Sequence, residues 1–437
     1  MYLMGYPHVS RISTGIHDFL YASALYLGDG TCDILLIAVD VVAVSRELVC
    51  QCRAAISRAT AIPPDHILIS AMHTHSGPAM VEILALRDDP TLPPPDPNYL
   101  AYVSQKIIEA GTEAYHQATA ARAAITSCQA AGVGGNRHTP GGPSDPEAGM
   151  IYLRRKDSGG PLALWVVYSM HPTVLHEDST WISADFPGST RRYLKEHLPG
   201  VKVIYHTGPC GNQSPRHSIQ SHTFAEAERL GQRLGRAVLE RIEALQEEDF
   251  SEEIPLSAGQ DLVELPGRTM YSVAEAERRL QKARQEYTRL LQEGGDPGSI
   301  RTAECSVFGA EEAVTLARAQ ENGEVERFRR CCTPAEVQVL RIGDTFIAGL
   351  PGELFVEYGL AIKRRAPGRA FVVSLANGEL QGYVVTAEAS GYEADLGIFA
   401  PEAGDVMVEA AAGLMQQYKS NIRTVPGKKE VMKETAI

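Results

Sequence analysis

The stretch "SAMHTHSGPAM", residues 70–80, places two histidines one residue apart, directly after the apolar run "HILIS". Such a run is typical of a buried β-strand, and the "SGP" that follows favours a reversal of the chain. Because side chains alternate between the two faces of an extended segment, we expect His73 and His75 on the same face. Two imidazoles there could chelate a metal, serve as a ligand and a proton carrier, or hydrogen-bond within a polar pocket.

Strand and helix patterns alternate on both sides of this stretch. Runs rich in Val, Ile and Leu predict strands, and amphipathic segments predict helices, the first of them after an N-cap serine, Ser45. Strands are expected at 32–44, 65–73, 149–157, 160–172 and 201–208, and helices at 45–60, 98–119, 189–198 and 223–245. This alternation predicts an α/β fold in which a layered, mixed β-sheet is flanked by helices.

The pattern changes after residue 245. Segments 273–293 and 303–330 are rich in Ala, Glu, Arg and Leu at helical spacing, and "GGDPGS" separates them. We therefore predict a helical hairpin inserted over residues 269–330. We expect it to be a packing layer or a surface through which two copies pair, rather than a substrate lid. The stretch "AEVQVLRIGDTFIAGLPGELF" then returns to a β-hairpin.

The composition excludes several classes of protein. The 437 residues carry a formal net charge of −13 without a basic cluster, which argues against nucleic-acid binding. No window approaches the roughly 18 apolar residues of a membrane span, and no amphipathic anchor is seen, so we expect no stable membrane attachment. The first residues lack a signal-peptide pattern and the cysteines are scattered, which predicts a reduced, cytoplasmic protein. We expect one domain over residues 1–424 and a loose polar tail at 425–437.

Polar residues also end other predicted strands. His171 follows the apolar run of 160–172, Ser214 lies in a turn after 201–208, and Glu353 ends the β-hairpin. Sites assemble at the carboxyl ends of strands in α/β sheets. Each residue also has an ordinary explanation, because strand-end histidines are usually satisfied polar groups, Glu353 could cap the next helix, and Ser214 suits a turn. Spacing alone makes a metal-dependent hydrolase one reading among several.

Seven stretches taken in order resemble the neutral, non-lysosomal ceramidases over most of their amino-terminal catalytic domain. They are "MGYPHVSRISTGIHDFLYASAL", "HTHSGPA", "GGNRHTP", "YSMHPTVL" with "ISADFPG", "GPCGNQSPR", "LPGELF" and "GYVVTAEASGYEADLG". The resemblance implies a ceramidase-like zinc amidohydrolase that acts on linear amides. That family continues into a carboxyl-terminal immunoglobulin-like domain, and we expect no counterpart to it here.

The resemblance implies a zinc ion with four protein ligands, His73, His171, Glu353 and Tyr383. Two imidazoles, a carboxylate and a phenolate oxygen suit Zn²⁺, and a catalytic site keeps a further position open for water. The pKa of such a water falls toward about 7, which supplies a nucleophile for an amide carbonyl.

Four further residues are implied to act around the ion. His75 would pass a proton to the leaving amine. Arg137 and Tyr392 would offset the charge that develops on the tetrahedral oxygen. Ser214 would orient the water or hydrogen-bond to the substrate, and we rank a nucleophilic role for it second.

The sequence also departs from the family. Asn212 stands where the family's serine motif has an aspartate, the segment from Tyr383 to Tyr392 is shorter, and we expect no strand before "MGYP". We therefore expect a small, soluble N-acyl compound as the substrate in preference to ceramide, with esters and lactones chemically adjacent. Two alternatives stay open: an esterase, amidase or acyltransferase that depends on Ser214 without a catalytic metal, and a ligand-binding homologue without catalysis.

Overall fold

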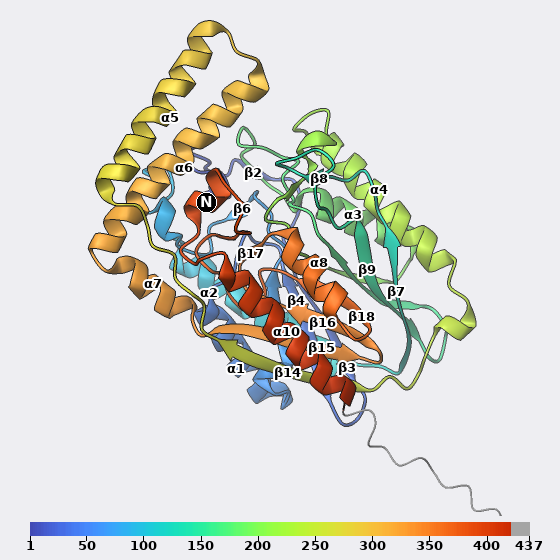
Figure 1. The fold of residues 1–437 in the computed structure, drawn as a ribbon. Coiled ribbons are helices and arrows are strands. Elements are labelled where there is room, and N and C mark those ends of the chain that lie inside the picture. The colour runs from blue at the N-terminus through green and yellow to red at the C-terminus, as the bar shows by residue number, and fades with distance from the viewer. Residues whose placement is uncertain (421–437) are drawn as a thin grey trace, which may run out of the picture.

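Three mixed sheets form the centre of the structure, a computed structural model that describes residues 1–420 (Figure 1). The first sheet has the order β3-β4-β5, with β3 and β4 antiparallel and β4 and β5 parallel. Its strands are β3 (Ala22–Gly28), β4 (Asp33–Val39) and β5 (Ile67–Ala71). The predicted tail, residues 425–437, lies outside the described residues.

The other two sheets have four strands each. In the second sheet, β10 pairs in parallel with β12 and antiparallel with β9. In the third, β16 pairs in parallel with β18 and antiparallel with β15. The strands in sheet order are β12 (Lys202–Thr207), β10 (Pro161–Tyr168), β9 (Glu147–Arg155) and β7 (Ala121–Gln129), then β14 (Leu256–Val263), β15 (Ala335–Ile342), β16 (Thr345–Gly349) and β18 (Arg369–Val373).

One apolar core joins the three sheets. It contains Leu36 of the first sheet, Trp165 of the second and Ile347 of the third, all fully buried. Trp165 also contacts Phe371 of β18, with ring centroids 5.9 Å apart. The sheets therefore stack as layers, as sheets with one apolar face must.

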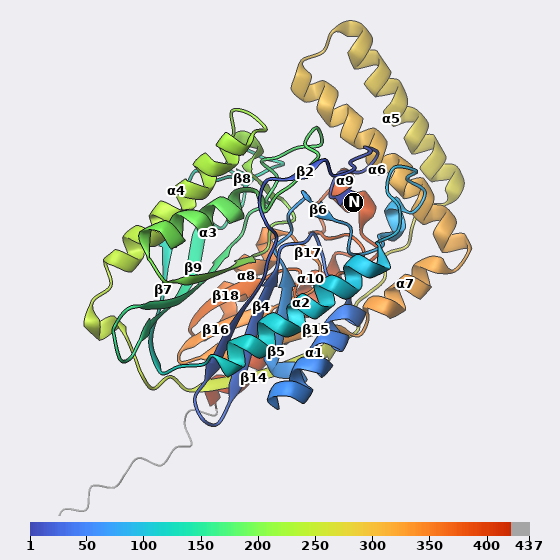
Figure 2. The same cartoon turned by 180° about the vertical axis from the view of Figure 1, so that it is seen from behind.

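Helices cover the outer faces of these sheets (Figures 1 and 2). Separate apolar cores lie beneath α1 and α2 on the first sheet, α3 and α4 on the second, and α8 and α10 on the third. The side chain of Ser45 accepts a hydrogen bond from the amide of Leu48 and caps α1, as predicted. Their bounds are α1 (Arg46–Thr60), α2 (Pro97–His116), α3 (Asp185–His197), α4 (Phe224–Glu243), α8 (Val356–Arg365) and α10 (Glu402–Ser420). The α/β fold predicted from the sequence is confirmed.

The helical hairpin projects from this layered body (Figure 1). Its first helix, α5 (Val273–Glu293), has the predicted bounds. The second predicted helix is instead two, α6 (Pro297–Glu321) and α7 (Glu324–Cys332). The prediction of one helix was wrong because Gly323 adopts a left-handed conformation, with φ 73°, and ends the run. The inner end of α6 packs against the short helix α9 (Tyr392–Leu396).

Two-residue ribbons connect the loops at one end of the sheets. They pair β1 (Leu3–Met4) with β6 (Gly77–Pro78), β2 (Gly15–Ile16) with β11 (Trp181–Ile182), β8 (Gly135–Asn136) with β13 (Gln213–Ser214), and β17 (Glu353–Leu354) with β19 (Tyr383–Val384). These ribbons bring together loops that are far apart in the sequence, and they carry three of the predicted site residues, Ser214, Glu353 and Tyr383. Across residues 1–420, no helix combines the length and the apolar character that crossing a bilayer requires.

Candidate active site

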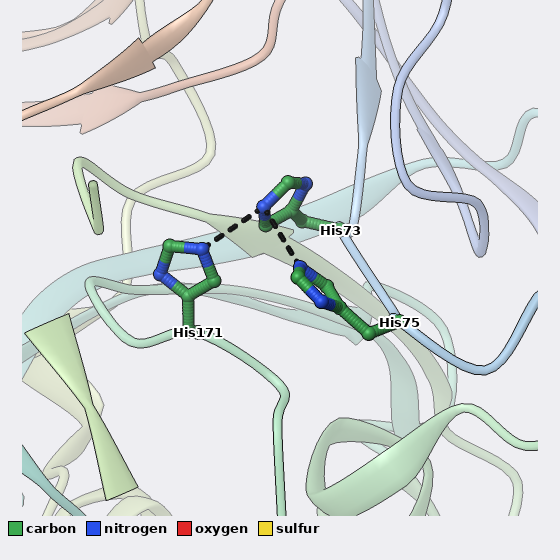
Figure 3. Close-up of side chains that lie close together, drawn as sticks. All are labelled: His73, His75 and His171. Atoms are coloured by element: carbon green, nitrogen blue, oxygen red, sulfur yellow. Dashed lines mark hydrogen bonds between the residues drawn. The ribbon is translucent and has the colours of Figure 1, made fainter. Parts of the chain in front are cut away.

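Three buried donor atoms converge at the end of the sheets. Nε2 of His73 lies 3.1 Å from Nε2 of His171, and both lie close to Oε2 of Glu353, at 3.2 and 3.3 Å. Figure 3 shows the His73 ring between those of His171 and His75. Neighbouring donors around a tetrahedral ion bound at 2.0–2.1 Å lie about 3.3 Å apart, so the three atoms are spaced as ligands of one ion are.

Backbone carbonyls fix how the two histidine rings are turned. Nδ1–H of His73 donates to the carbonyl of Val42 at 2.6 Å. Nδ1–H of His171 donates to the carbonyls of Cys210 and Gln213, at 2.6 and 3.0 Å. With Nδ1–H bound to the backbone, Nε2 is the nitrogen of each ring that faces the cluster, which is the arrangement of metal-bound histidines.

Charge in the cluster also suits a cation. Oε2 of Glu353 is buried and has no hydrogen-bond partner. Burial tends to raise the pKa of this carboxyl, but His73 and His171 outweigh it and hold the pKa well below its usual value. Burial lowers the pKa of His171 to about 4. At neutral pH the carboxylate is therefore ionised and the His171 imidazole is neutral, the protonation states that metal binding requires.

His75 completes a group of three buried histidines, but it is held differently. Its Nε2 lies 3.3 Å from that of His73, and together with His171 the three could hold a metal ion. Its Nδ1 has no hydrogen-bond partner, so no backbone group fixes the ring as in the other two. Its contacts are instead to an aromatic ring, that of Tyr6, at 5.2 Å between centroids. A ring without such a fixed proton can exchange protons at either nitrogen.

The expectation that His73 and His75 share one face of an extended segment was wrong. Strand β5 ends at Ala71, and His73 has a φ of 73°, in the left-handed region. A non-glycine residue in this region costs free energy and persists where its surroundings hold it. The two Nε2 atoms therefore meet outside the strand, and strand periodicity does not explain why they are close.

Tyr383 lies beside Glu353. The two residues are directly paired across the ribbon of β17 and β19. Burial, with the Glu353 carboxylate, raises the pKa of the Tyr383 phenol. The guanidinium of Arg137 lies 5.3 Å from the centroid of its ring, and Nη2 of Arg137 lies 2.6 Å from Oε1 of Glu393. The structure therefore groups Arg137 and Tyr383 with the donor cluster.

Tyr392 follows this group as the first residue of α9. Its ring centroid lies 6.3 Å from that of Tyr383. On the other side it packs against α6 at Gly309, where an added Cβ would lie 3.2 Å from Cδ2 of Tyr392. The tyrosine thus lies between the hairpin and the donor cluster.

Ser214 lies near the donor cluster, but its hydroxyl interacts with the backbone and not with the cluster. It is buried, and its Oγ accepts a hydrogen bond from the amide of Arg216 at 3.1 Å. Among the described residues this Oγ makes no hydrogen bond to a histidine or a carboxylate. Asn212, which replaces the family's aspartate, accepts from the amide of Val356 at 2.9 Å and donates to Glu357 at 2.8 Å. Its side chain holds the start of α8 in place.

Three further residues of this region were not predicted from the sequence. Glu393 pairs with Arg137, Tyr6 contacts His75, and His8 lies between Tyr6 and the hairpin. All three stand within stretches that carried the family resemblance, "GYEAD" and "MGYPH". The resemblance of these stretches could have pointed to the three residues. The contacts that give them a role depend on tertiary packing, which the sequence does not show.

Comparison with known proteins places the fold. No family model and no curated protein matches the sequence. The structure is similar to a ceramidase complexed with C2 (TM-score 0.71, 16% identity), over 95% of this chain and 73% of the other. It is also similar to neutral ceramidase from Pseudomonas aeruginosa (TM-score 0.70, 17% identity), over 95% and 72%. The chain has a neutral ceramidase-like fold, which confirms the resemblance seen in the sequence.

Proposed function

We propose that this protein is a zinc-dependent hydrolase that cleaves the C–N bond of an N-acyl amide with an activated water. The observation that carries the proposal is the convergence of Nε2 of His73, Nε2 of His171 and Oε2 of Glu353, at 3.1 to 3.3 Å from one another. The ceramidase-like fold supports the choice of an amide as the scissile bond.

His73, His171, Glu353 and Tyr383 would hold the ion. The two rings are already turned by backbone carbonyls, and Tyr383 is paired with Glu353 across a ribbon. Bound zinc would lower the pKa of a water toward about 7 and polarise the substrate carbonyl.

The remaining residues would manage charge and protons. His75, with an unpaired Nδ1 at the edge of the cluster, would take a proton from the attacking water and return it to the leaving amine. Arg137 and Tyr392 would stabilise the negative charge on the carbonyl oxygen, and Glu393 holds the Arg137 guanidinium in position. Ser214 would hydrogen-bond to the substrate.

The serine-dependent alternative has less support. A serine nucleophile needs a general base within hydrogen-bond reach, and the described residues offer Ser214 none. We therefore favour a small N-acyl compound hydrolysed with the help of zinc.

Metal content per chain is the first test, on protein purified without a chelator or a polyhistidine tag. We expect about one zinc per chain, and hydrolysis of short N-acyl amides that chelation abolishes and added zinc restores. Folded protein that contains no zinc, or an amidase activity that survives chelation but is lost in Ser214→Ala, would contradict the proposal.

A further inference from the structure

The amino-terminal segment links the candidate metal cluster to the hairpin. Gly5 packs so closely on His75 that an added Cβ would lie 2.5 Å from Cγ of that ring. Tyr6 contacts the same histidine, and His8 stacks on Phe308 of α6 with ring centroids 4.9 Å apart. Within four residues the chain thus passes from the cluster to the inner face of α6.

Glu312 lies one turn beyond Phe308 on that helix. Its side chain is only 1% exposed, and neither carboxylate oxygen has a hydrogen-bond partner. The one basic group near it among the described residues is His8, whose Nε2 lies 3.7 Å away and is itself without a partner. A buried carboxylate left in this state costs free energy, so a ligand that supplies hydrogen-bond donors would be favoured.

The neighbouring carboxylates are already satisfied. Asp89 accepts hydrogen bonds from the amide of His8 at 2.6 Å and from the amide and hydroxyl of Thr91 at 2.8 and 2.7 Å. Glu311, which faces Nδ1 of His8 at 3.6 Å, pairs with Arg284 of α5 at 2.6 Å. Glu312 is thus the member of this acidic group whose carboxylate accepts no hydrogen bond.

The turn of α6 that carries Glu312 lies beside the candidate active site. Gly309, one turn before Glu312, contacts Tyr392. Burial and then the Glu312 carboxylate raise the pKa of the Tyr392 phenol. The His8 side chain, which faces Glu312, is 21% exposed, whereas that of Glu312 is 1% exposed. Burial raises the pKa of Glu312 itself to about 7, even though His8 lowers it.

We propose that Glu312, flanked by His8 and Tyr392, forms a subsite for a primary ammonium group of the substrate. An ammonium offers three donors to a carboxylate that accepts no hydrogen bond, and it can bring its charge closer than the His8 ring, whose Nε2 lies 3.7 Å away. Such charge-assisted hydrogen bonds are the strong ones. A site built for a charged donor rejects an analogue that lacks it, because its own polar group is then left unpaired. The inference rests on the proposed amide hydrolysis only for its place beside the reacting bond.

Binding of a small probe tests the subsite without any turnover. We would measure n-butylammonium and n-butanol by calorimetry on the wild type, on Glu312→Gln and on Glu321→Gln, an exposed position of the same helix. The wild type and Glu321→Gln should bind the ammonium at least about tenfold more tightly than the alcohol, and Glu312→Gln should lose that preference. No preference in the wild type would overturn the inference, whatever the variants do.

Matched substrates then test the same group in catalysis. Short N-acyl amides would carry a primary ammonium on the acyl side or on the amine side, with a hydroxyl in its place as the control. In Glu312→Gln we expect KM for one ammonium substrate to rise about tenfold or more with kcat little changed, and the hydroxyl substrate to be unaffected. Equal losses for both substrates would mean that Glu312 is structural.

The two proposals fail separately. If the ammonium binds and Glu312→Gln abolishes that binding, but no amide is cleaved, the subsite stands and the proposed hydrolysis is wrong. If amides are cleaved with zinc and neither the probe nor the ammonium substrates are preferred, the hydrolysis stands and the subsite is wrong.

Discussion

At the scale of single residues, the candidate site depends on how each ring is held. His73 and His171 each donate from Nδ1 to the backbone, whereas His75 has no such bond. The resemblance to ceramidases predicted which residues would be neighbours. It did not predict the left-handed backbone at His73. The surrounding loops impose this φ, and no residue type or motif next to the histidine signals it.

Glu353→Ala should remove both zinc and turnover. Changes outside the ligand shell already cost about 10- to 100-fold in metal affinity, so the loss of a ligand should cost at least about a hundredfold. Metal content after dialysis and amide hydrolysis are the measurements, with Glu388→Ala, at an exposed position, as the matched control. A Glu353 variant with full zinc and activity would remove this residue from the site.

His75→Ala should keep zinc and lose rate. Removal of a general acid or base costs about 10² to 10⁴ in turnover, while His73, His171 and Glu353 still converge on the ion. Zinc content and kcat would be measured on the same preparation. Loss of the metal would show that His75 is a ligand, as the cluster of three histidines also permits.

At the scale of elements, local sequence predicted the hairpin but not its contacts. The bounds of α5 follow from its helical periodicity and the Gly294 that ends it, with φ 68°. The break between α6 and α7 lies at Asn322 and Gly323, a pair that favours a turn. That α6 borders the candidate site could not be predicted, because it depends on packing against α9 and the amino-terminal segment. Pairing of two copies through the hairpin stays a prediction.

Gly309→Leu should separate metal binding from catalysis. The new side chain would push on Tyr392, and a displacement of about 1 Å at a catalytic group can cost about 100-fold in rate. We expect kcat to fall with zinc content unchanged. Gly413→Leu on α10 is the matched control, because a Cβ there meets nothing within 4 Å. Equal activity in both variants would show that α6 does not position Tyr392.

At the scale of the whole molecule, one buried carboxyl should make the free energy of unfolding depend on pH. Asp185 is 1% exposed, and burial raises its pKa from 3.8 to about 6, although the amides of Leu175 and Phe186 donate to it. A carboxyl whose pKa is raised by folding stabilises the folded state at low pH, and this contribution is lost as the pH rises through about 6.

Relative to Asp185→Asn, the wild type should therefore gain about 1 kcal/mol of unfolding free energy between pH 7 and pH 5. Denaturant titrations of both proteins at the two pH values measure this difference. An unchanged difference would mean that Asp185 titrates near its ordinary pKa in the folded protein.

The ribbons that hold the site also have a consequence for how the protein is made. Each is two residues long and joins distant parts of the chain, and the last one adds Tyr383 to Glu353. Closing such long loops for so few backbone hydrogen bonds is entropically costly, so we expect these pairings to form late in folding. A ribosome would have to release residue 383 before the four candidate ligands could meet. The chain would then bind its metal only when folding is nearly complete. A cell that is short of zinc would accumulate folded protein without metal.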